Sequence, residues 1–220
     1  MITITGKKKM MSNTGKLIIV SGPAGSGKST VLKELFKLAD YKYSISATTR
    51  NPRSGEIDGV DYYFISEEEF LKKISKGEML EHVEYSGHYY GTLKKPVEKM
   101  LEQGHNVILE IEVVGALSVK EKYPEALMIF LTPPNYFELE KRLRGRGTET
   151  EESIHNRLER AKKEVENISK YDYLVLNEFG SYKQTAFDIN CIVESEKCKL
   201  NQKKASDFLK DYFAYVNKKR

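Results

Sequence analysis

A glycine-rich loop near the start of the chain constrains its fold more than any other feature. Residues 22–30 read Gly-Pro-Ala-Gly-Ser-Gly-Lys-Ser-Thr, which fits the spacing Gly-x4-Gly-Lys-Ser. The apolar run Leu17–Val20 precedes the loop, and apolar residues at helical spacing follow it. A strand, a glycine loop and a helix in this order are typical of a phosphate-binding loop.

The residue types of this loop explain how it would bind phosphate. Glycines let the backbone turn tightly, so that several N–H groups point inward, and the following helix adds partial positive charge at its N-terminus. Lys28 can reach the outer phosphates, and the hydroxyl of Ser29 can ligate Mg²⁺. We therefore predict a nucleotide site with a Mg²⁺ cofactor.

Composition excludes several classes of protein. The 220 residues, 40% hydrophobic and 31% charged, suffice for one α/β domain with inserted lobes. A net charge of +4, from 36 basic and 32 acidic residues, is milder than nucleic-acid binding usually requires. No apolar stretch approaches the ~20 residues that cross a bilayer, and the first residues lack the apolar centre of a signal peptide. Cys191 and Cys198 are interpreted as reduced thiols, so a cytoplasmic protein is expected. The charge and the absence of long apolar stretches lead us to expect no nucleic-acid and no membrane partner.

The chain alternates between short apolar runs and helical patterns. This alternation favours a parallel sheet of five strands that is covered by helices on both faces. The expected core strands are Leu17–Ser21, Tyr43–Ala47, Val107–Glu112, Ala126–Thr132 and Tyr171–Leu176.

Two stretches break this alternation, and a helical segment follows the last strand. Residues 48–95 are rich in Gly and Tyr, and Ser66 with Glu69 has the form of a capping box, which predicts an inserted lobe with antiparallel strands and one helix. Residues 142–157 are polar, which favours a mobile flap over core. After residue 191 a helical segment carries an apolar stripe, which we expect to pack on the domain. The stripe consists of Phe208, Leu209, Tyr212 and Phe213.

The inserted lobe carries a second candidate for phosphate binding. Thr49-Arg50-Asn51-Pro52-Arg53 brings two guanidinium groups close together, and such groups match phosphate oxygens well. Tyrosines follow in the same lobe, including Tyr62 and Tyr90. These residues could hold a monophosphate, or the arginines could form surface ion pairs while the tyrosines pack in the lobe; the pattern alone leaves both open.

Several motifs together resemble the guanylate kinase family. They are the loop at 22–30, Ser44-Ile-Ser-Ala-Thr-Thr-Arg-Asn-Pro-Arg-Ser-Gly-Glu-Ile-Asp-Gly-Val-Asp-Tyr-Tyr-Phe64, Glu81, Ser86-Gly-His-Tyr-Tyr-Gly-Thr92 and Gly145-Arg-Gly-Thr-Glu-Thr-Glu-Glu-Ser153. The resemblance spans residues 16–190 and implies an α/β fold with a five-stranded parallel sheet, a phosphate loop, a small α+β GMP-binding lobe and a mobile lid. It divides the chain into a flexible tail at 1–15, a core at 16–47, 96–141 and 170–190, the lobe at 48–95, the lid at 142–169 and a helical extension at 191–220.

The resemblance also implies a role for each matching residue. It implies a kinase that transfers phosphate from ATP to GMP, with Mg²⁺, as a monomer or homodimer. The ATP site would comprise Gly22, Pro23, Ala24, Gly25, Ser26, Gly27, Lys28, Ser29, Thr30 and Asn177, with Ser29 on the metal. The GMP site would comprise Ser46, Arg50, Arg53, Tyr62, Glu81, Tyr90, Thr92 and Glu112, and the catalytic residues would be Lys28, Arg50, Arg146 and Arg157.

Two departures and three alternatives accompany the resemblance. Glu112 and Val114 stand where the family usually has Asp and Gln, and Ala24 stands where it commonly has Ser. A kinase for another nucleoside monophosphate and a non-catalytic interaction domain of the same fold are the main alternatives. A regulatory GTPase is disfavoured because the sequence contains no Asn-Lys-x-Asp motif.

Overall fold

A sheet of five parallel strands forms the centre of the molecule, as the alternating pattern predicted. The computed structural model describes residues 15–85, 87–145, 150–200 and 202–217. The strand order is β2-β7-β1-β8-β9, and the neighbouring pairs are all parallel. The strands are β1 (Leu17–Ser21), β2 (Tyr41–Tyr43), β7 (Asn106–Glu110), β8 (Leu127–Thr132) and β9 (Tyr173–Leu176).

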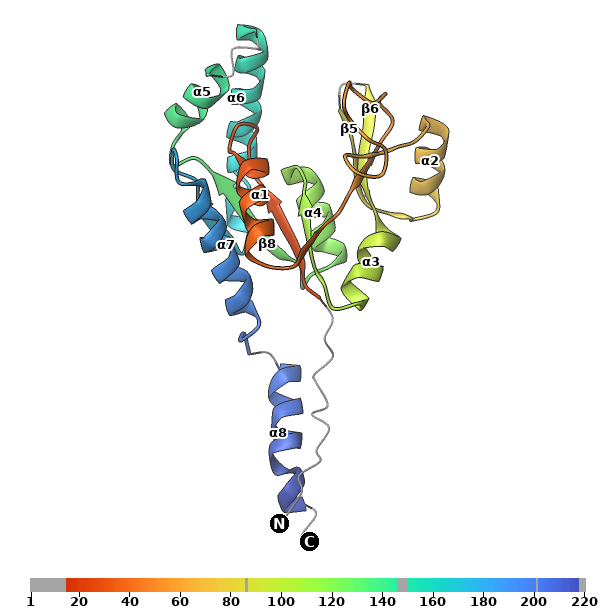
Figure 1. Ribbon diagram of the computed structural model, residues 1–220, viewed down its shortest axis with the longest axis vertical. Helices are drawn as coiled ribbons and strands as arrows, with labels where there is room; N and C mark the ends of the chain where they lie inside the picture. The colour runs from red at the N-terminus through yellow and green to blue at the C-terminus, as the bar shows by residue number, and fades with distance from the viewer. Residues whose placement is uncertain (1–14, 86, 146–149, 201, 218–220) are drawn as a thin grey trace.

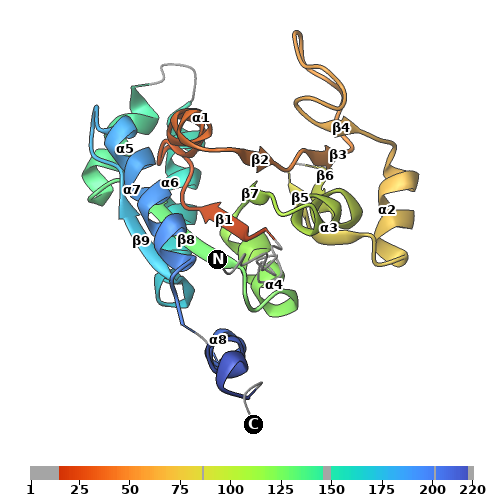
Figure 2. The same ribbon diagram turned by 60° about the horizontal axis from the view of Figure 1, so that its bottom comes forward.

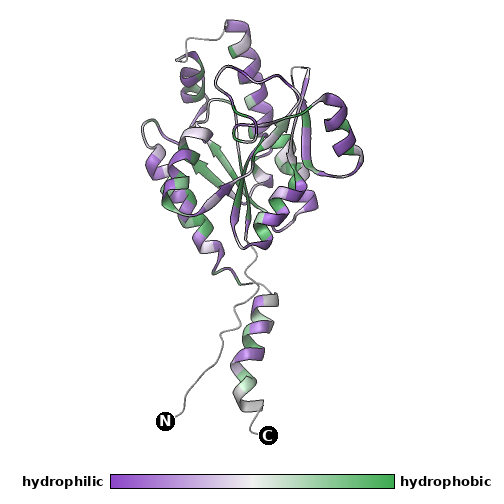
Figure 3. Ribbon diagram, turned by 45° about the vertical axis from the view of Figure 1, so that its right-hand side comes forward, coloured by the Kyte–Doolittle hydropathy of each residue, from purple (hydrophilic) through white to green (hydrophobic). Residues whose placement is uncertain are grey.

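Helices cover both faces of this sheet, which is why the middle residues of its central strands are all apolar. Helices α1 (Lys28–Leu38) and α7 (Tyr182–Glu196) pack on one face, and α3 (Lys94–Glu102) and α4 (Val113–Lys122) pack on the other (Figure 2). Every residue of β1 is buried. Strands buried on both faces need no polar alternation, and Figure 3 shows their apolar residues gathered at the centre of the domain.

The predicted strand Tyr43–Ala47 is wrong: the structure has two short strands there. Strand β2 ends at Tyr43, and the N–H of Ser44 makes the last hydrogen bond toward the core sheet, to the carbonyl of Ile108 at 3.1 Å. The chain then enters β3 (Ser46–Thr48), which belongs to a second sheet. A continuous β-branched and aromatic pattern indicates extended backbone, but it does not indicate which sheet each residue joins.

The second sheet builds the predicted lobe, in the order β4-β3-β6-β5. It contains β4 (Tyr63–Phe64), β5 (Met79–Tyr85) and β6 (His88–Leu93), and Figure 1 shows it beside the core together with α2 (Glu67–Ser75). The hydroxyl of Ser66 accepts a hydrogen bond from the N–H of Glu69 at 3.1 Å, as the capping box predicted. The pairs β3–β6 and β5–β6 are antiparallel, as expected, whereas β3 and β4 are parallel.

Two helices occupy most of the segment at 142–157, for which we predicted a polar flap without core. Helices α5 (Tyr136–Arg144) and α6 (Glu151–Val165) enclose a small apolar cluster that includes Leu143 and Ile154. The cluster forms because apolar residues recur at helical spacing on both sides of the glycines, a pattern that the high charge of the segment obscured. The predicted catalytic residue Arg146 lies outside the described residues.

The apolar stripe near the C-terminus does not pack on the domain, contrary to our expectation. Helix α7 crosses residue 190, the predicted domain end, and Val193 is buried in the core. A short 3₁₀ helix (Ile168–Lys170) precedes β9, and α8 (Gln202–Asn217) follows α7 and extends away from the domain (Figure 1). The four stripe residues of α8 are 48–67% exposed. Amphipathic spacing predicts a helix with an apolar face, but it does not predict what covers that face.

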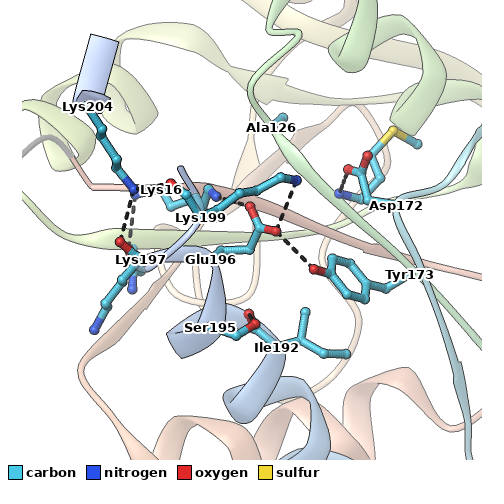
Figure 4. A network of polar contacts seen from close by, with 12 residues as sticks. Lys16, Ala126, Asp172, Tyr173, Ile192, Ser195, Glu196, Lys197, Lys199 and Lys204 are labelled. Atoms are coloured by element: carbon cyan, nitrogen blue, oxygen red, sulfur yellow. Dashed lines mark hydrogen bonds and ion pairs between the residues drawn. The ribbon is translucent and has the colours of Figure 1, made fainter. Parts of the chain in front are cut away.

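A buried carboxylate fixes the end of α7 (Figure 4). Glu196 accepts hydrogen bonds from Lys16 at 2.6 Å, Tyr173 at 2.9 Å and Lys199 at 3.2 Å. Burial disfavours the charged form of Glu196, but these three bonds outweigh it and lower the pKa of the carboxyl to about 2. Lys204 of α8 donates to the carbonyls of residues 197 and 199, so polar contacts mark the point where α8 leaves the domain.

Candidate active site

The principal cavity lies where β1 and β7 end, between the phosphate loop, the lobe and α6. It has a volume of about 810 Å³, and a second cavity of about 260 Å³ adjoins it toward the lobe. Ser46, Tyr62 and Glu112 line both cavities, so the two are compartments of one cleft. Carboxyl ends of parallel strands are the usual location of ligand sites in open α/β sheets.

Two glycines of the phosphate loop are required by its geometry. Gly22 has a φ of +147°, and a Cβ atom there would lie 2.0 Å from the carbonyl oxygen of Leu131. Gly27, with a φ of +90°, would bring a Cβ atom to 2.5 Å from the side-chain amide of Asn177. The backbone therefore passes too close to its neighbours, in too unusual a conformation, for any other residue.

The lysine of the loop folds back over the loop itself. Its ammonium donates to the carbonyls of Gly22 at 2.6 Å and Pro23 at 3.1 Å. The hydroxyl of Ser26 is fully buried and has no hydrogen-bond partner among the described residues. The loop thus holds the cation of Lys28 on the wall of the cavity where phosphate oxygens would be bound.

An acidic residue that our sequence interpretation missed stands beside the predicted metal ligand. The hydroxyl of Ser29 donates to a carboxylate oxygen of Glu110 at 2.8 Å. Hydroxyl and carboxylate oxygens are ligands that suit Mg²⁺. Among the described residues no group of three His, Cys, Asp or Glu could hold a metal, so a magnesium ion here would take further ligands from the nucleotide phosphates and water. The sequence signal that could have revealed Glu110 is its position, as an acidic residue at the end of a strand next to β1.

A buried carboxylate dominates the smaller cavity. Glu81 of β5 is only 4% exposed, and its carboxylate accepts a hydrogen bond from the hydroxyl of Thr92 at 2.7 Å. Burial raises the pKa of Glu81, and the bonds from Thr92 oppose this shift. Gly115 of α4 makes room for the group, because a Cβ atom there would lie 2.8 Å from a carboxylate oxygen of Glu81. Tyr90 also lines this cavity.

The two arginines of the lobe differ in their surroundings. The guanidinium of Arg50 donates two hydrogen bonds to the carboxylate of Glu56, both at 2.6 Å, and lies over the ring of Tyr62 at 5.1 Å. These bonds, with one from the backbone N–H of Arg53, lower the pKa of Glu56 to about 2. The Arg53 side chain is exposed. Our sequence interpretation left ion pairing open for these arginines, and Arg50 forms such a pair.

Asn177, predicted to lie near adenine, is buried against the phosphate loop. Its amide donates to the carbonyl of Ser26 at 2.8 Å, and its oxygen accepts from the hydroxyl of Thr185 at 3.2 Å. Arg142, which we had not singled out, donates to the carbonyl of Asn177 at 2.7 Å and approaches Ser26 as well. Arg157 of α6 lines the large cavity. Asn177, which follows β9, and Arg142 of α5 therefore both contact the backbone of the phosphate loop.

The comparisons with known proteins agree with this architecture. The family model described as "Guanylate kinase" matches residues 14–192. The chain belongs to the guanylate kinase family. It is 47% identical over 192 residues to the guanylate kinase of Clostridium acetobutylicum, a match that covers 87% of this chain and 91% of that protein. It is 54% identical over 170 residues to that of Streptococcus thermophilus, covering 76% and 81%.

A solved guanylate kinase also has this fold. The crystal structure of the enzyme from Anaplasma phagocytophilum superposes with a TM-score of 0.68 at 32% identity, over 86% of this chain and 90% of that one. None of the described helices is both long and apolar enough to span a membrane.

Within this guanylate kinase fold, half of the predicted site residues line one cleft. The large cavity is lined by Gly22, Ala24, Lys28, Ser29, Ser46, Tyr62, Glu112 and Arg157, and the small one by Ser46, Tyr62, Glu81, Tyr90 and Glu112. Pro23, Gly25, Ser26, Gly27, Thr30, Arg50, Arg53, Thr92 and Asn177 stand outside these linings. Several of them instead brace the residues that form the walls, as Thr92 does for Glu81.

The unusual Glu112 has a partner that the sequence did not indicate. Glu112 precedes the first residue of α4, and its carboxylate forms an ion pair with the guanidinium of Arg160 in α6. The neighbouring departure, Val114, is 67% exposed. In α6, the family resemblance had pointed to Arg157 and not to Arg160.

Proposed function

We propose that this enzyme transfers the γ-phosphoryl group of ATP to GMP, giving ADP and GDP. One observation carries the proposal. A phosphate loop with a lysine lines one compartment of the cleft and a buried carboxylate lines the adjoining one, and five residues form walls of both: Ser46, Tyr62, Glu110, Ile111 and Glu112. Such a cleft suits two nucleotides bound with their phosphates facing each other and one base in the smaller compartment.

Selection of guanine is assigned to Glu81. Guanine presents its N1–H and an exocyclic N2–H side by side, and one carboxylate can accept both. Adenine has no such pair of donors, so AMP would leave a buried carboxylate without partners, a loss that produces strong discrimination. We assign Thr92 to orienting Glu81, and Ser46 and Glu112 to further contacts around the base. The GMP phosphate is assigned to Arg50, Arg53, Tyr62 and Tyr90, with the phosphate replacing part of the Glu56 pairing of Arg50. GMP and dGMP are both proposed as acceptors.

The chemical step needs no protein nucleophile. An oxygen of the GMP phosphate attacks the γ-phosphorus of ATP, the bond from that phosphorus to the bridging oxygen breaks, and the electron pair leaves on the β-phosphate of ADP. The second pKa of a phosphate monoester is about 6, so the attacking oxygen is largely deprotonated at neutral pH. A general base is therefore unnecessary.

The protein contributes positive charge and alignment. Lys28 leaves the loop carbonyls for the β- and γ-phosphates, and Arg157 and Arg146 contribute cations from the lid. Ser29, with Glu110 beside it, would hold a Mg²⁺ ion, which would supply positive charge to the phosphates. We assign the buried Asn177 to supporting the loop next to the adenine position. The cytoplasmic location and the monomeric or homodimeric state belong to this proposal as predictions.

A coupled assay of ADP release tests the function. Purified enzyme with ATP and Mg²⁺ is given AMP, GMP, CMP or UMP in turn, with EDTA as the metal control. We expect turnover with GMP to exceed the others by about 10³-fold or more, because a site built to pair polar groups strongly rejects ligands that lack them. Comparable rates with AMP or UMP would contradict the assignment of Glu81.

A further inference from the structure

Helix α6 presents a row of charged side chains to the phosphate compartment. Arg157, Arg160 and Glu164 follow one another along the helix at spacings of three and four residues, so they share one face. All three line the large cavity, as do Lys28 and Ser29 of the phosphate loop. The family resemblance assigns a role to Arg157 but none to Arg160.

Arg160 bridges two carboxylates from different parts of the molecule. One amino group of its guanidinium donates to Glu112, and Nε donates to Glu164 at 2.9 Å. These contacts raise the pKa of the Arg160 guanidinium even though its burial acts in the opposite direction. The bridge therefore joins the lid helix α6 to the residue that lies between the two compartments.

The position of Glu112 makes this bridge sensitive to the substrate. Glu112 lines both compartments, whereas Arg160 and Glu164 line only the phosphate compartment. Arg160 thus reaches Glu112 from the phosphate side, and a base in the small compartment would reach it from the opposite side. Any donor on that base competes with Arg160 for the same carboxylate.

The contact between Arg160 and Glu112 is weak enough to be exchanged for another partner. The side chains of Arg160 and Glu112 are 37% and 42% exposed, and ion pairs at such exposure contribute little free energy. A phosphoryl group in transfer carries more charge than a carboxylate, and the planar guanidinium binds it through two parallel hydrogen bonds. Once Glu112 is engaged by a base, the phosphates therefore become the better partner for Arg160.

We propose that Arg160 is a third lid cation whose release depends on guanine. With the small compartment empty, Glu112 and Glu164 hold Arg160 away from the phosphates. When GMP binds, the donors of the base engage Glu112, and Arg160 turns along the face of α6 to the transferred phosphoryl group. Presence of the correct base is thereby coupled to delivery of positive charge at the reaction centre. This inference rests on the proposed GMP site, and in particular on contact between Glu112 and the base.

The test compares Arg160→Gln, Arg160→Lys, Glu112→Gln and the control Lys163→Gln in the full chain. Lys163 is an exposed residue of the same helix, so its substitution removes an equal charge outside the cleft. For each variant we would measure kcat and the KM of both substrates, together with the Kd of GMP by titration calorimetry without ATP. Thermal unfolding verifies that each variant is folded.

We expect Arg160→Gln to lower kcat with GMP by about 10²-fold, because one cation that stabilises the transferred group contributes on this scale. The Kd of GMP should stay equal or fall by up to about 5-fold, since Glu112 is no longer occupied by a competitor. Arg160→Lys should retain part of the rate, and Lys163→Gln should match the parent protein.

Three results would overturn the proposal. A higher Kd for GMP with unchanged kcat in Arg160→Gln would mean that Arg160 only orients Glu112. Unchanged kcat and Kd with a lower melting temperature would mean a purely structural bridge. An unchanged Kd for GMP in Glu112→Gln would remove the contact with the base and the coupling with it. Failure of the parent protein to make GDP would instead refute the proposed function itself.

Discussion

The two ends of the central sheet use charged residues in opposite ways. At the amino ends of β1, β8 and β9, Glu196 is buried among three donors, and Asp172 accepts from Lys120 at 2.9 Å and from the N–H of Met128 at 2.8 Å. At the carboxyl ends, the ammonium of Lys28 rests on loop carbonyls, and Arg160 is half exposed between two carboxylates. The amino end is stabilised by its charges, whereas the carboxyl end keeps charges that a ligand can redirect.

The difference shows how one sheet separates stability from catalysis. Charges whose carboxylates are already saturated by hydrogen bonds hold the fold but cannot respond to a substrate. Charges held by exposed or backbone partners contribute little to stability, so phosphate can take them over. Substitutions at the two ends should therefore change different observables.

Lys28→Ala should have the largest effect. Without the ammonium, the charge of the transferred phosphoryl group is left uncompensated, and kcat should fall by about 10³-fold or more. The melting temperature should shift little, because the ammonium of Lys28 donates to carbonyls of the loop itself. Steady-state kinetics and thermal unfolding measure both quantities. A variant with nearly normal turnover would refute the assignment of the loop.

Glu81→Gln should lower kcat/KM for GMP by about 10²- to 10³-fold, because the amide cannot accept both guanine donors. The KM of ATP should change much less, since Glu81 lies in the small compartment only. Parallel titrations of GMP and ATP make the comparison. Equal losses for both substrates would contradict a role in base recognition.

Glu196→Gln should destabilise the opposite end by about 2 kcal/mol, because three donors lose a buried carboxylate. The free energy of unfolding, from urea titration, should fall while kcat stays within about two-fold of the parent. A large loss of activity at full stability would refute the separation between the two ends.

The pH dependence of stability sharpens the same comparison. The folded pKa of Glu196 is about 2, below the ordinary value of 4.5, so its contribution is present above pH 4.5 and is lost as the pH falls toward 2. The unfolded chain binds the extra proton in this window, and stability must therefore rise with pH across it. In Glu196→Gln the rise between pH 2 and 4.5 should be smaller, which acid titration of unfolding can measure.

The smallest effect is expected on α8. Replacing Phe208 and Tyr212 by Ser should change the free energy of unfolding by less than about 0.5 kcal/mol and leave kcat unchanged, because both side chains are exposed. Chemical denaturation of the double variant checks this expectation. A loss above about 2 kcal/mol would mean that the apolar face of α8 is buried in solution.

Local features of the sequence predicted the parts of the site that local geometry determines. The phosphate loop follows from glycine spacing and its flanks, and the lobe helix follows from one capping residue, because both depend on contacts within a few residues. Glu110 was missed because its partner Ser29 is 81 residues away, and Arg160 was missed because Glu112 is 48 residues away. Such contacts exist only once β7 and α6 are placed beside the loop.

The sequence by itself determined the class of fold, the phosphate loop and the family, since strand and helix periods and short motifs are properties of neighbouring residues. Only the tertiary structure decided which sheet each half of Tyr43–Ala47 joins, that α8 leaves the domain, and which carboxylate holds each cation of the cleft. The physical reason is that burial and ion pairing depend on distances between elements, and these distances arise only when the sheets and helices pack.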